Sequence, residues 1–248
     1  MQDFSGVFNI DQQGGTFRFL KSKPVLDWPV SLGKPIPSTL AGQLVWWKSG
    51  PDWVLAARDL NWQGAGLNIM LDSQIQFYHS KNAPMLNLAA RIAPFDFKTA
   101  KRFWLRNSMP DSSIRWLDMA LVKGQIRDAS IVMAGDLGRW PFTDKAGRFS
   151  ARATILAEQF KFAADWPEAQ NAKLFTDFNG PGFTAIGTAS FLGNPIELKT
   201  SGIESFAKSD LKVNVHSSSK MQTLLPVLKN TPLKNTVGDL VVGLQGNG

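Results

Sequence analysis

The sequence offers few residues whose chemistry could drive a reaction. The chain has no cysteine, and its two histidines, His79 and His216, lie far apart without a second histidine at the spacing of metal ligands. Both lie in alternating, strand-like segments, and we interpret them as surface or hairpin residues. Nothing in the sequence brings the acidic residues Asp59 and Asp72 together. These residue types predict no catalytic site, no metal site and no bound cofactor.

The glycine-rich motifs give no reactive site either. GAG at residues 64–66 lacks the third glycine of a dinucleotide-binding loop, and NGPGF at 179–183 has the composition of a hairpin turn. Neither G-x-S-x-G nor a Walker A motif occurs in the sequence. The chemistry that remains is the noncovalent burial of apolar groups.

One short segment shows what kind of apolar surface the chain builds. GRFSARATI, residues 147–155, alternates between polar and apolar residues, which is typical of a strand with one wet and one dry face. Two of the four residues on its dry face are the small Ala151 and Ala153. In FTAIGTASF, residues 183–191, the dry face again carries small residues, Ala185 and Ala189 among them. Small residues on a dry face leave room for the chain of a bound apolar molecule, but they also suit a helix packed closely on the sheet. The residues expected to line the dry face are Ile131, Met133, Phe149, Ala151, Ala153, Ile155, Ala185, Ala189 and Phe191.

The rest of the chain supplies many similar strands. A hairpin is expected near Gly14-Gly15, and further strand-like runs are 39–47, 52–60, 65–78, 83–92, 129–137, 172–178, 183–191 and 211–217. Short spacers rich in Gly, Pro, Asn and Asp favour an antiparallel meander. Roughly 12 to 16 strands exceed the number at which open sheets tend to curl, split or flatten. The pattern therefore predicts an all-β fold, a long twisted antiparallel sheet curled into an open hydrophobic groove.

Two helices are expected to interrupt this pattern. Residues 97–107 form an amphipathic stretch that could lie on an anionic membrane, although docking on the sheet through Phe103 and Trp104 is the favoured interpretation. A second helix is expected after an N-cap at Ser112 or Ser113, with Gly124 at the C′ position. We expect residues 97–124 to be a helical insertion between two strand-rich halves, 1–96 and 125–248.

Composition narrows the class of protein. The net charge of +7 comes from scattered Lys and Arg residues, which favours a solvated basic surface and no tight binding of nucleic acid. No run approaches 18 consecutive apolar residues, and the N-terminus lacks the features of a signal peptide. Because a strand-like pattern is still running at residues 240–248, we expect the chain to be a piece of a longer protein.

The order of several motifs resembles one known family. Residues 112–149 carry Trp116-Leu117, Ala120-Leu121, Gly124 and Trp140-Pro141-Phe142, followed by a Gly-x-Phe strand. Residues 160–167 then end in Trp166-Pro167, and AKLFTDF follows at 172–178. This order resembles the YhdP branch of the AsmA-like proteins of Gram-negative bacteria, most strongly over residues 112–180.

The resemblance implies a large protein that is anchored in the inner membrane and runs through the periplasm. Its long β-groove would conduct phospholipid toward the outer membrane, and the expected partners are phospholipid acyl chains, membranes at the ends of the full-length protein, and other copies of this fragment through its sheet edges. Two alternatives stay open at this stage. One is a non-catalytic structural or interaction module with a closed β-sandwich core, and the other is an enzyme acting on envelope glycans, which would need paired carboxylates in a cleft.

Overall fold

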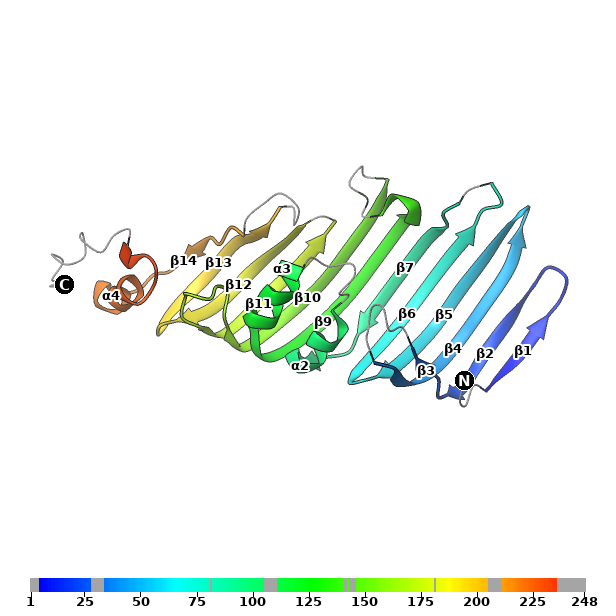
Figure 1. Ribbon diagram of the computed structural model, residues 1–248, viewed down its shortest axis with the longest axis horizontal. Helices are drawn as coiled ribbons and strands as arrows, with labels where there is room; N and C mark the ends of the chain where they lie inside the picture. The colour runs from blue at the N-terminus through cyan, green and yellow to red at the C-terminus, as the bar shows by residue number, and fades with distance from the viewer. Residues whose placement is uncertain are drawn as a thin grey trace.

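The computed structural model describes residues 5–27, 34–80, 82–104, 111–140, 142, 146–180, 182–204 and 211–235. These residues form one antiparallel sheet of fourteen strands with a few short helices (Figure 1). The strands are β1 Gly6–Ile10, β2 Gly14–Ser22, β3 Val25–Leu26, β4 Ile36–Ser49, β5 Asp52–Gly64, β6 Leu67–Phe77, β7 Met85–Ile92, β8 Phe95–Asp96, β9 Leu121–Asp136, β10 Gly147–Phe160, β11 Ala169–Asn179, β12 Gly182–Phe191, β13 Asn194–Ile203 and β14 Val215–His216. The helices are α2 Phe97–Ala100, η1 Lys101–Phe103, α3 Asp111–Ala120, η2 Leu137–Arg139 and α4 Met221–Lys229.

The sheet is an open meander. Its order is β1-β2-β4-β5-β6-β7-β9-β10-β11-β12-β13-β14, with β3 paired to β4 and β8 paired to β9. In the described part of the chain β1 and β14 lie at opposite ends of the sheet and do not pair with each other (Figure 1). The predicted all-β class and the long antiparallel sheet are therefore confirmed, and the described strands do not form the two packed sheets of a closed sandwich.

Bulges bend several strands of the sheet. Asp59, Asp128, Asn171 and Thr200 have φ angles of +48°, +52°, +51° and +36°, and each lies where the strand register shifts by one residue. An extra residue of this kind bends its strand and increases the local twist. Because bulges occur on β5, β9, β11 and β13, the curvature is distributed along the sheet.

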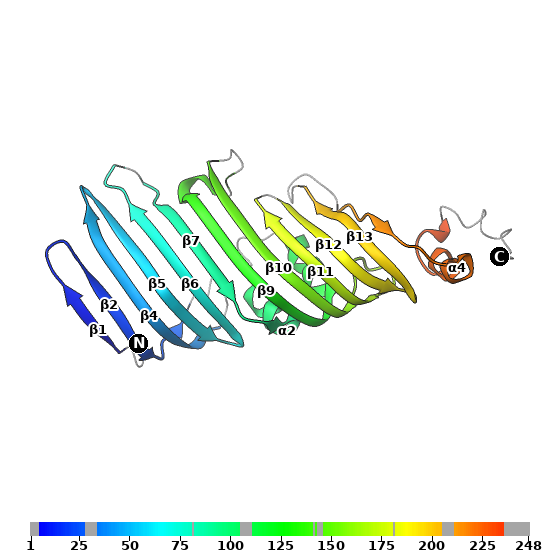
Figure 2. The ribbon, with the colours of Figure 1, turned by 180° about the vertical axis from the view of Figure 1, so that it is seen from behind.

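The helical segment between β8 and β9 lies on one face of the sheet. Helices α2 and α3 are in front of the strands in Figure 1 and behind them in Figure 2. Phe97 and Ala100 of α2 are buried. The Phe103 ring packs edge-on against Trp62 of β5, with ring centres 6.1 Å apart. The docking of this basic stretch on the sheet through Phe103 is confirmed, and Trp104 donates its indole N–H to Asp118 of α3.

The first helix begins at Phe97 as predicted, but the other predicted helix ends were wrong. The described helical structure of the first ends at Phe103, because Trp104 has extended backbone angles, and residues 105–107 lie outside the described part. The second begins at Asp111, so that Ser112 and Ser113 lie in its first turn, and it ends at Ala120. Leu121 already pairs with Phe160 of β10, and Gly124 lies inside β9 at φ +151°, so strand pairing overrides the local helical pattern.

Two smaller predictions are also corrected. The first hairpin turns at residues 11–13, where the Asp11 carboxylate accepts hydrogen bonds from the N–H groups of Gln13 and Gly14, and the two glycines belong to β2. His79 lies beyond the end of β6 rather than in the strand, but it is exposed in the loop of the β6–β7 hairpin, which confirms that it is a surface or hairpin residue. Its backbone N–H donates to the Asp52 carboxylate at 3.0 Å. His216 lies on β14, and the hairpin at 179–183 is confirmed. Pro141 and residues 240–248 lie outside the described residues.

Helix α2 is capped by a titrating carboxylate. Asp96 accepts a hydrogen bond from the Thr99 N–H at 2.6 Å. The Thr99 hydroxyl, the Thr99 N–H and the charge of Lys98 hold the pKa of Asp96 below its ordinary value of 3.8. A carboxyl group whose pKa is lowered by folding stabilises the fold above its unfolded pKa, and this contribution disappears as the pH falls through the folded pKa.

We expect Asp96→Ala to lower the free energy of unfolding by about 1 kcal/mol at neutral pH, because a helix N-cap is lost. The difference from the wild type should shrink as the pH falls below 3.8, where the wild-type carboxylate protonates. Urea unfolding at a series of pH values measures this difference. A difference that stays constant down to the acid limit of folding would contradict the role of the charge, and Asp96→Asn, which keeps a capping oxygen without titrating, is the control.

Candidate functional site

The strand register joins side chains, all apolar except Ser73, into rows across one face of the sheet, which we call the inner face. One row crosses eight strands from β1 to β10 through Phe8, Phe17, Leu44, Ala57, Ser73, Leu88, Met133 and Phe149. A second row crosses from β5 to β13 through Leu60, Leu71, Ala90, Ile131, Ala151, Phe178, Phe183 and Ile203. At about 4.8 Å per strand, the two rows together give an apolar surface about 50 Å long.

The opposite, outer face is more polar and carries basic residues, although Val7, Met70 and Phe175 are exposed on it. It carries every arginine of the described strands, namely Arg18, Arg58, Arg91, Arg127, Arg148 and Arg152. Arg152 pairs with Asp177 at 3.0 Å. The two faces therefore differ in chemistry, as expected of an antiparallel sheet with one solvated face.

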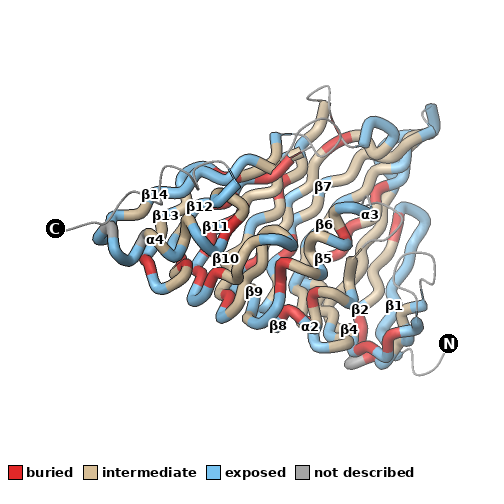
Figure 3. The backbone as a smooth tube through the Cα atoms, turned by 60° about the vertical axis from the view of Figure 1, so that its left-hand side comes forward, coloured by how far each residue is buried: buried red, intermediate tan, exposed pale blue. Residues whose placement is uncertain are grey.

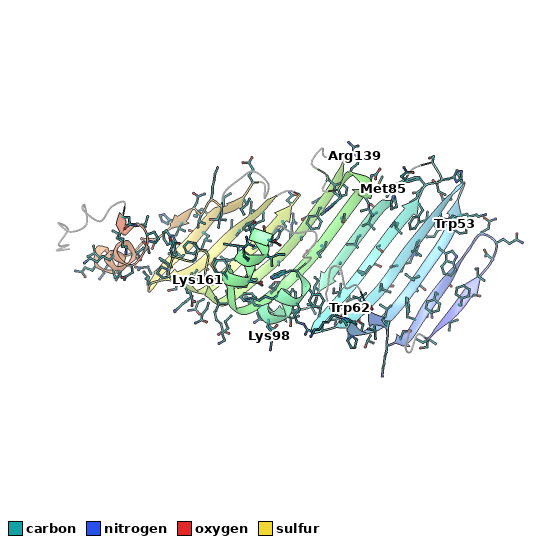
Figure 4. The ribbon with its side chains drawn as sticks, viewed as in Figure 1. Trp53, Trp62, Met85, Lys98, Arg139 and Lys161 are labelled. Atoms are coloured by element: carbon teal, nitrogen blue, oxygen red, sulfur yellow. The ribbon has the colours of Figure 1, made fainter. Side chains whose placement is uncertain are left out.

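The N-terminal part of the inner face is an open surface that we call the trough, and it extends from β1 to β9 and over Phe149, Ala151 and Ala153 of β10. Phe8, Ile10 and Trp53 are 57%, 63% and 42% exposed, and the inner residues of β6 and β7 are mostly half-buried (Figure 3). Trp53 and Met85 mark one rim of the sheet and Trp62 the other (Figure 4). Large apolar side chains here remain in contact with water when nothing covers them.

The C-terminal part is covered, and under the cover lies a partly open cavity of about 690 Å³ that we call the chamber. Its floor includes Ile155, Leu174, Thr176, Ala185, Ala189, Phe191 and Leu198 of β10 to β13. Its roof includes Trp116 and Leu117 of α3, Phe162 and Trp166 of the β10–β11 connection, Val227 of α4, and Leu233. Buried residues are correspondingly frequent on β11 (Figure 3).

Polar anchors tie the roof of the chamber in place. The Trp116 indole N–H donates to the Phe162 carbonyl at 2.8 Å, and its ring packs at 6.1 Å from the Phe183 ring on β12. Lys101 donates to the Asp118 carbonyl at 2.7 Å, which links η1 to α3. Helix α3 is thus held to a neighbouring loop and to the sheet beneath it.

The polar groups of the chamber lining are already paired with the protein. Thr176 donates to the Ala153 carbonyl at 3.1 Å, and the Asn194 amide donates to the carbonyls of Leu192 and Thr223 at 3.1 and 2.8 Å. The Ser201 hydroxyl accepts from the Asn214 N–H at 3.0 Å. Among the described residues no buried side-chain nitrogen or oxygen lacks a hydrogen-bond partner. The chamber therefore presents apolar surface to any occupant.

The structure places all nine predicted lining residues on the inner face and divides them between its two parts. Ile155, Ala185, Ala189 and Phe191 line the chamber. The other five lie on the inner face outside the chamber, and all are half-buried: Ile131, Met133, Phe149, Ala151 and Ala153.

The small residues of the inner face fall into two groups. Ala157, Ala172 and Ala189 belong to the buried core beneath Phe97 and Leu121, and a Cβ on Gly124 would lie 2.9 Å from the Phe97 ring. Ala151 and Ala153 lie outside that core. The sequence did not predict the roof of the chamber, in particular Trp116, Phe162 and Trp166. The signal that could have revealed it was the aromatic residues close to Trp166-Pro167.

The described part of the chain contains no cluster of three His, Cys, Asp or Glu side chains able to hold a metal ion. None of its helices is long and apolar enough to cross a membrane. An open sheet with one continuous apolar face and a covered chamber is the architecture of a protein that accommodates long apolar molecules.

Comparison with known sequences identifies the family. The model of the YhdP protein family matches residues 1–248, so the chain belongs to this family. It is 25% identical over 170 residues to the intermembrane phospholipid transporter YhdP of Escherichia coli (strain K12), an alignment that covers 68% of this chain. The match spans only 13% of the length of that relative. No solved structure matches the chain.

Proposed function

We propose that this chain is a non-catalytic segment of a YhdP-type protein that conducts phospholipid between the inner and outer membranes and so supports the outer-membrane permeability barrier. The segment would work in the periplasm, as part of a protein anchored in the inner membrane, and the membranes would lie beyond its two ends. Residues 1–248 would act as one groove segment, with the helical insertion between β8 and β9 as part of its roof.

The continuity of the inner-face rows is the observation that carries this proposal. Exposing acyl methylenes to water costs about 0.8 kcal/mol each, so a two-chain lipid with roughly 30 of them faces a barrier on the order of 20 kcal/mol. An apolar surface that crosses the whole sheet removes most of this barrier at every strand. The E. coli relative, described as an intermembrane phospholipid transporter, makes phospholipid the best supported passenger.

A charge placed on the open trough should interrupt this path. Ala153 is half-buried and points to the inner face, so we expect Ala153→Asp to leave the far-UV circular dichroism nearly unchanged and to reduce the amount of bound phospholipid. Phospholipid extracted from the purified chain and quantified by mass spectrometry measures the effect. Thr154→Asp puts the same charge on the next residue but on the outer face, and it should bind as the wild type does. Equal binding by both variants and the wild type would contradict the proposal.

A further inference from the structure

The chamber differs from the open trough in a way that bears on how a lipid is held. We infer that the chamber is a discrete binding site for one acyl chain of a phospholipid, whose headgroup and second chain stay outside. This inference rests on the proposed lipid-conducting function and adds to it a defined binding site along the apolar face.

The chamber has the size of a site for a single ligand. Its volume of about 690 Å³ lies within the range of about 300–1,000 Å³ that is typical of small-molecule pockets. A pocket of this size suits one bound group such as an acyl chain.

The length of the chamber agrees with this capacity. Residues from β10 to β14 line it, and five strands span about 19 Å from the first to the last. One leaflet of a bilayer has a hydrocarbon depth of about 15 Å, half of its core thickness. An extended acyl chain can therefore lie across these strands from end to end.

The chemistry of the lining excludes the headgroup. The Thr176 hydroxyl, the Asn194 side-chain N–H group and the Ser201 hydroxyl all bond to backbone groups of the protein. A phosphate or ammonium group moved into the chamber would lose its water and find no charged side chain among the lining residues, which costs several kcal/mol. Only the alkyl part of a lipid gains by entering.

The anchored roof makes this site slower to exchange than the trough. Lifting α3 off the chamber breaks the bond from Trp116 to the Phe162 carbonyl and separates the Trp116 ring from Phe183. No such contact holds a lipid on the half-exposed residues of β6 and β7. A lipid in the chamber should therefore survive dilution and gel filtration that strip the trough.

The first test uses the wild-type 248-residue chain and native mass spectrometry. After incubation with dipalmitoyl phosphatidylethanolamine vesicles and gel filtration, we expect one phospholipid per chain. Palmitate should displace it one for one, whereas glycerophosphoethanolamine, the headgroup without chains, should not. Displacement by the headgroup alone, or retention of two phospholipids, would overturn the inference.

The second test fills the chamber. Ala185 is 7% exposed and pairs with Thr176 and Ser201 on the floor, so Ala185→Trp should lower retention at least about tenfold. Ile186→Trp is the matched control, because the neighbouring residue is 49% exposed on the outer face. Wild-type retention by a folded Ala185→Trp chain would overturn the inference, and if this variant does not fold, the competition experiment with the wild type still decides.

A third variant separates the inference from the proposed function. Ser73 lies on the inner face of β6, in the open trough, and Ser73→Trp should slow phospholipid transfer between vesicles without lowering the retained lipid. If the wild type binds lipid but Ala185→Trp retains it unchanged, only the chamber is wrong. If the wild type neither transfers nor retains phospholipid, the proposed function fails as well.

Discussion

Replacing Ala189 with aspartate should unfold the C-terminal half of the sheet, whereas the same change at Ala153 should not. Ala189 is 9% exposed and packs in the core with Phe97, Leu121 and Phe191. A carboxylate there loses its hydration without gaining a partner, and we expect a loss of about 3 kcal/mol or more in the free energy of unfolding. At Ala153 the carboxylate reaches water along the trough, and the loss should stay near 1 kcal/mol.

Urea unfolding followed by circular dichroism measures both changes. Thr188→Asp, on the exposed outer face beside Ala189, is the control for adding a negative charge to β12. Similar losses at Ala153 and Ala189 would mean that the inner face has the same degree of enclosure throughout, which contradicts the division into trough and chamber.

The second large effect is expected at Gly187 on β12. This residue has a φ of +151°, and a Cβ added to it would lie 2.0 Å from the Lys173 carbonyl oxygen and 2.9 Å from the Leu174 Cα on β11. Because the obstructing atoms belong to the backbone, no side-chain rotation relieves the contact. We expect Gly187→Val to cost about 3 kcal/mol or more, through backbone strain and loss of strand pairing.

A matched glycine lies only six positions away. Gly193, in the turn between β12 and β13, has a φ of +79° and no atom within 4 Å of an added Cβ. Asn is tolerated in this conformation, so Gly193→Asn should unfold at nearly the wild-type urea concentration. A Gly187→Val chain as stable as Gly193→Asn would show that β11 and β12 can separate at this point without cost.

The alternation of single strands was predictable from the sequence because it depends on neighbouring residues. Ala151 and Ile131 were placed on one face from their own segments, and the register pairs them directly. β13 was missed because Pro195 is its second residue and because Glu197 and Lys199, which face solvent, make it resemble a loop. Its partner strand β12 supplies the pairing that the local pattern does not reveal.

The covered and open parts of the inner face could not be told apart from the sequence. Ala153 and Ala189 are both alanines in strands with similar alternation, yet only Ala189 belongs to the buried core. The difference depends on contacts between distant segments, such as Trp116 and the Phe162 carbonyl, which are 46 residues apart. Local periodicity carries no information about such contacts.

Because each strand on the path pairs with its neighbours there, the length of the sheet depends on the number of hairpins. Each strand from β4 to β7 and from β9 to β13 pairs with those before and after it on the path, so every added hairpin lengthens the sheet by about 10 Å without rearranging the strands already present. Stability then accumulates as a sum of neighbour terms, as in solenoid repeats. The sheet can therefore become longer or shorter by whole hairpins, while the chamber, which depends on α3 and on β10 to β14, stays unchanged.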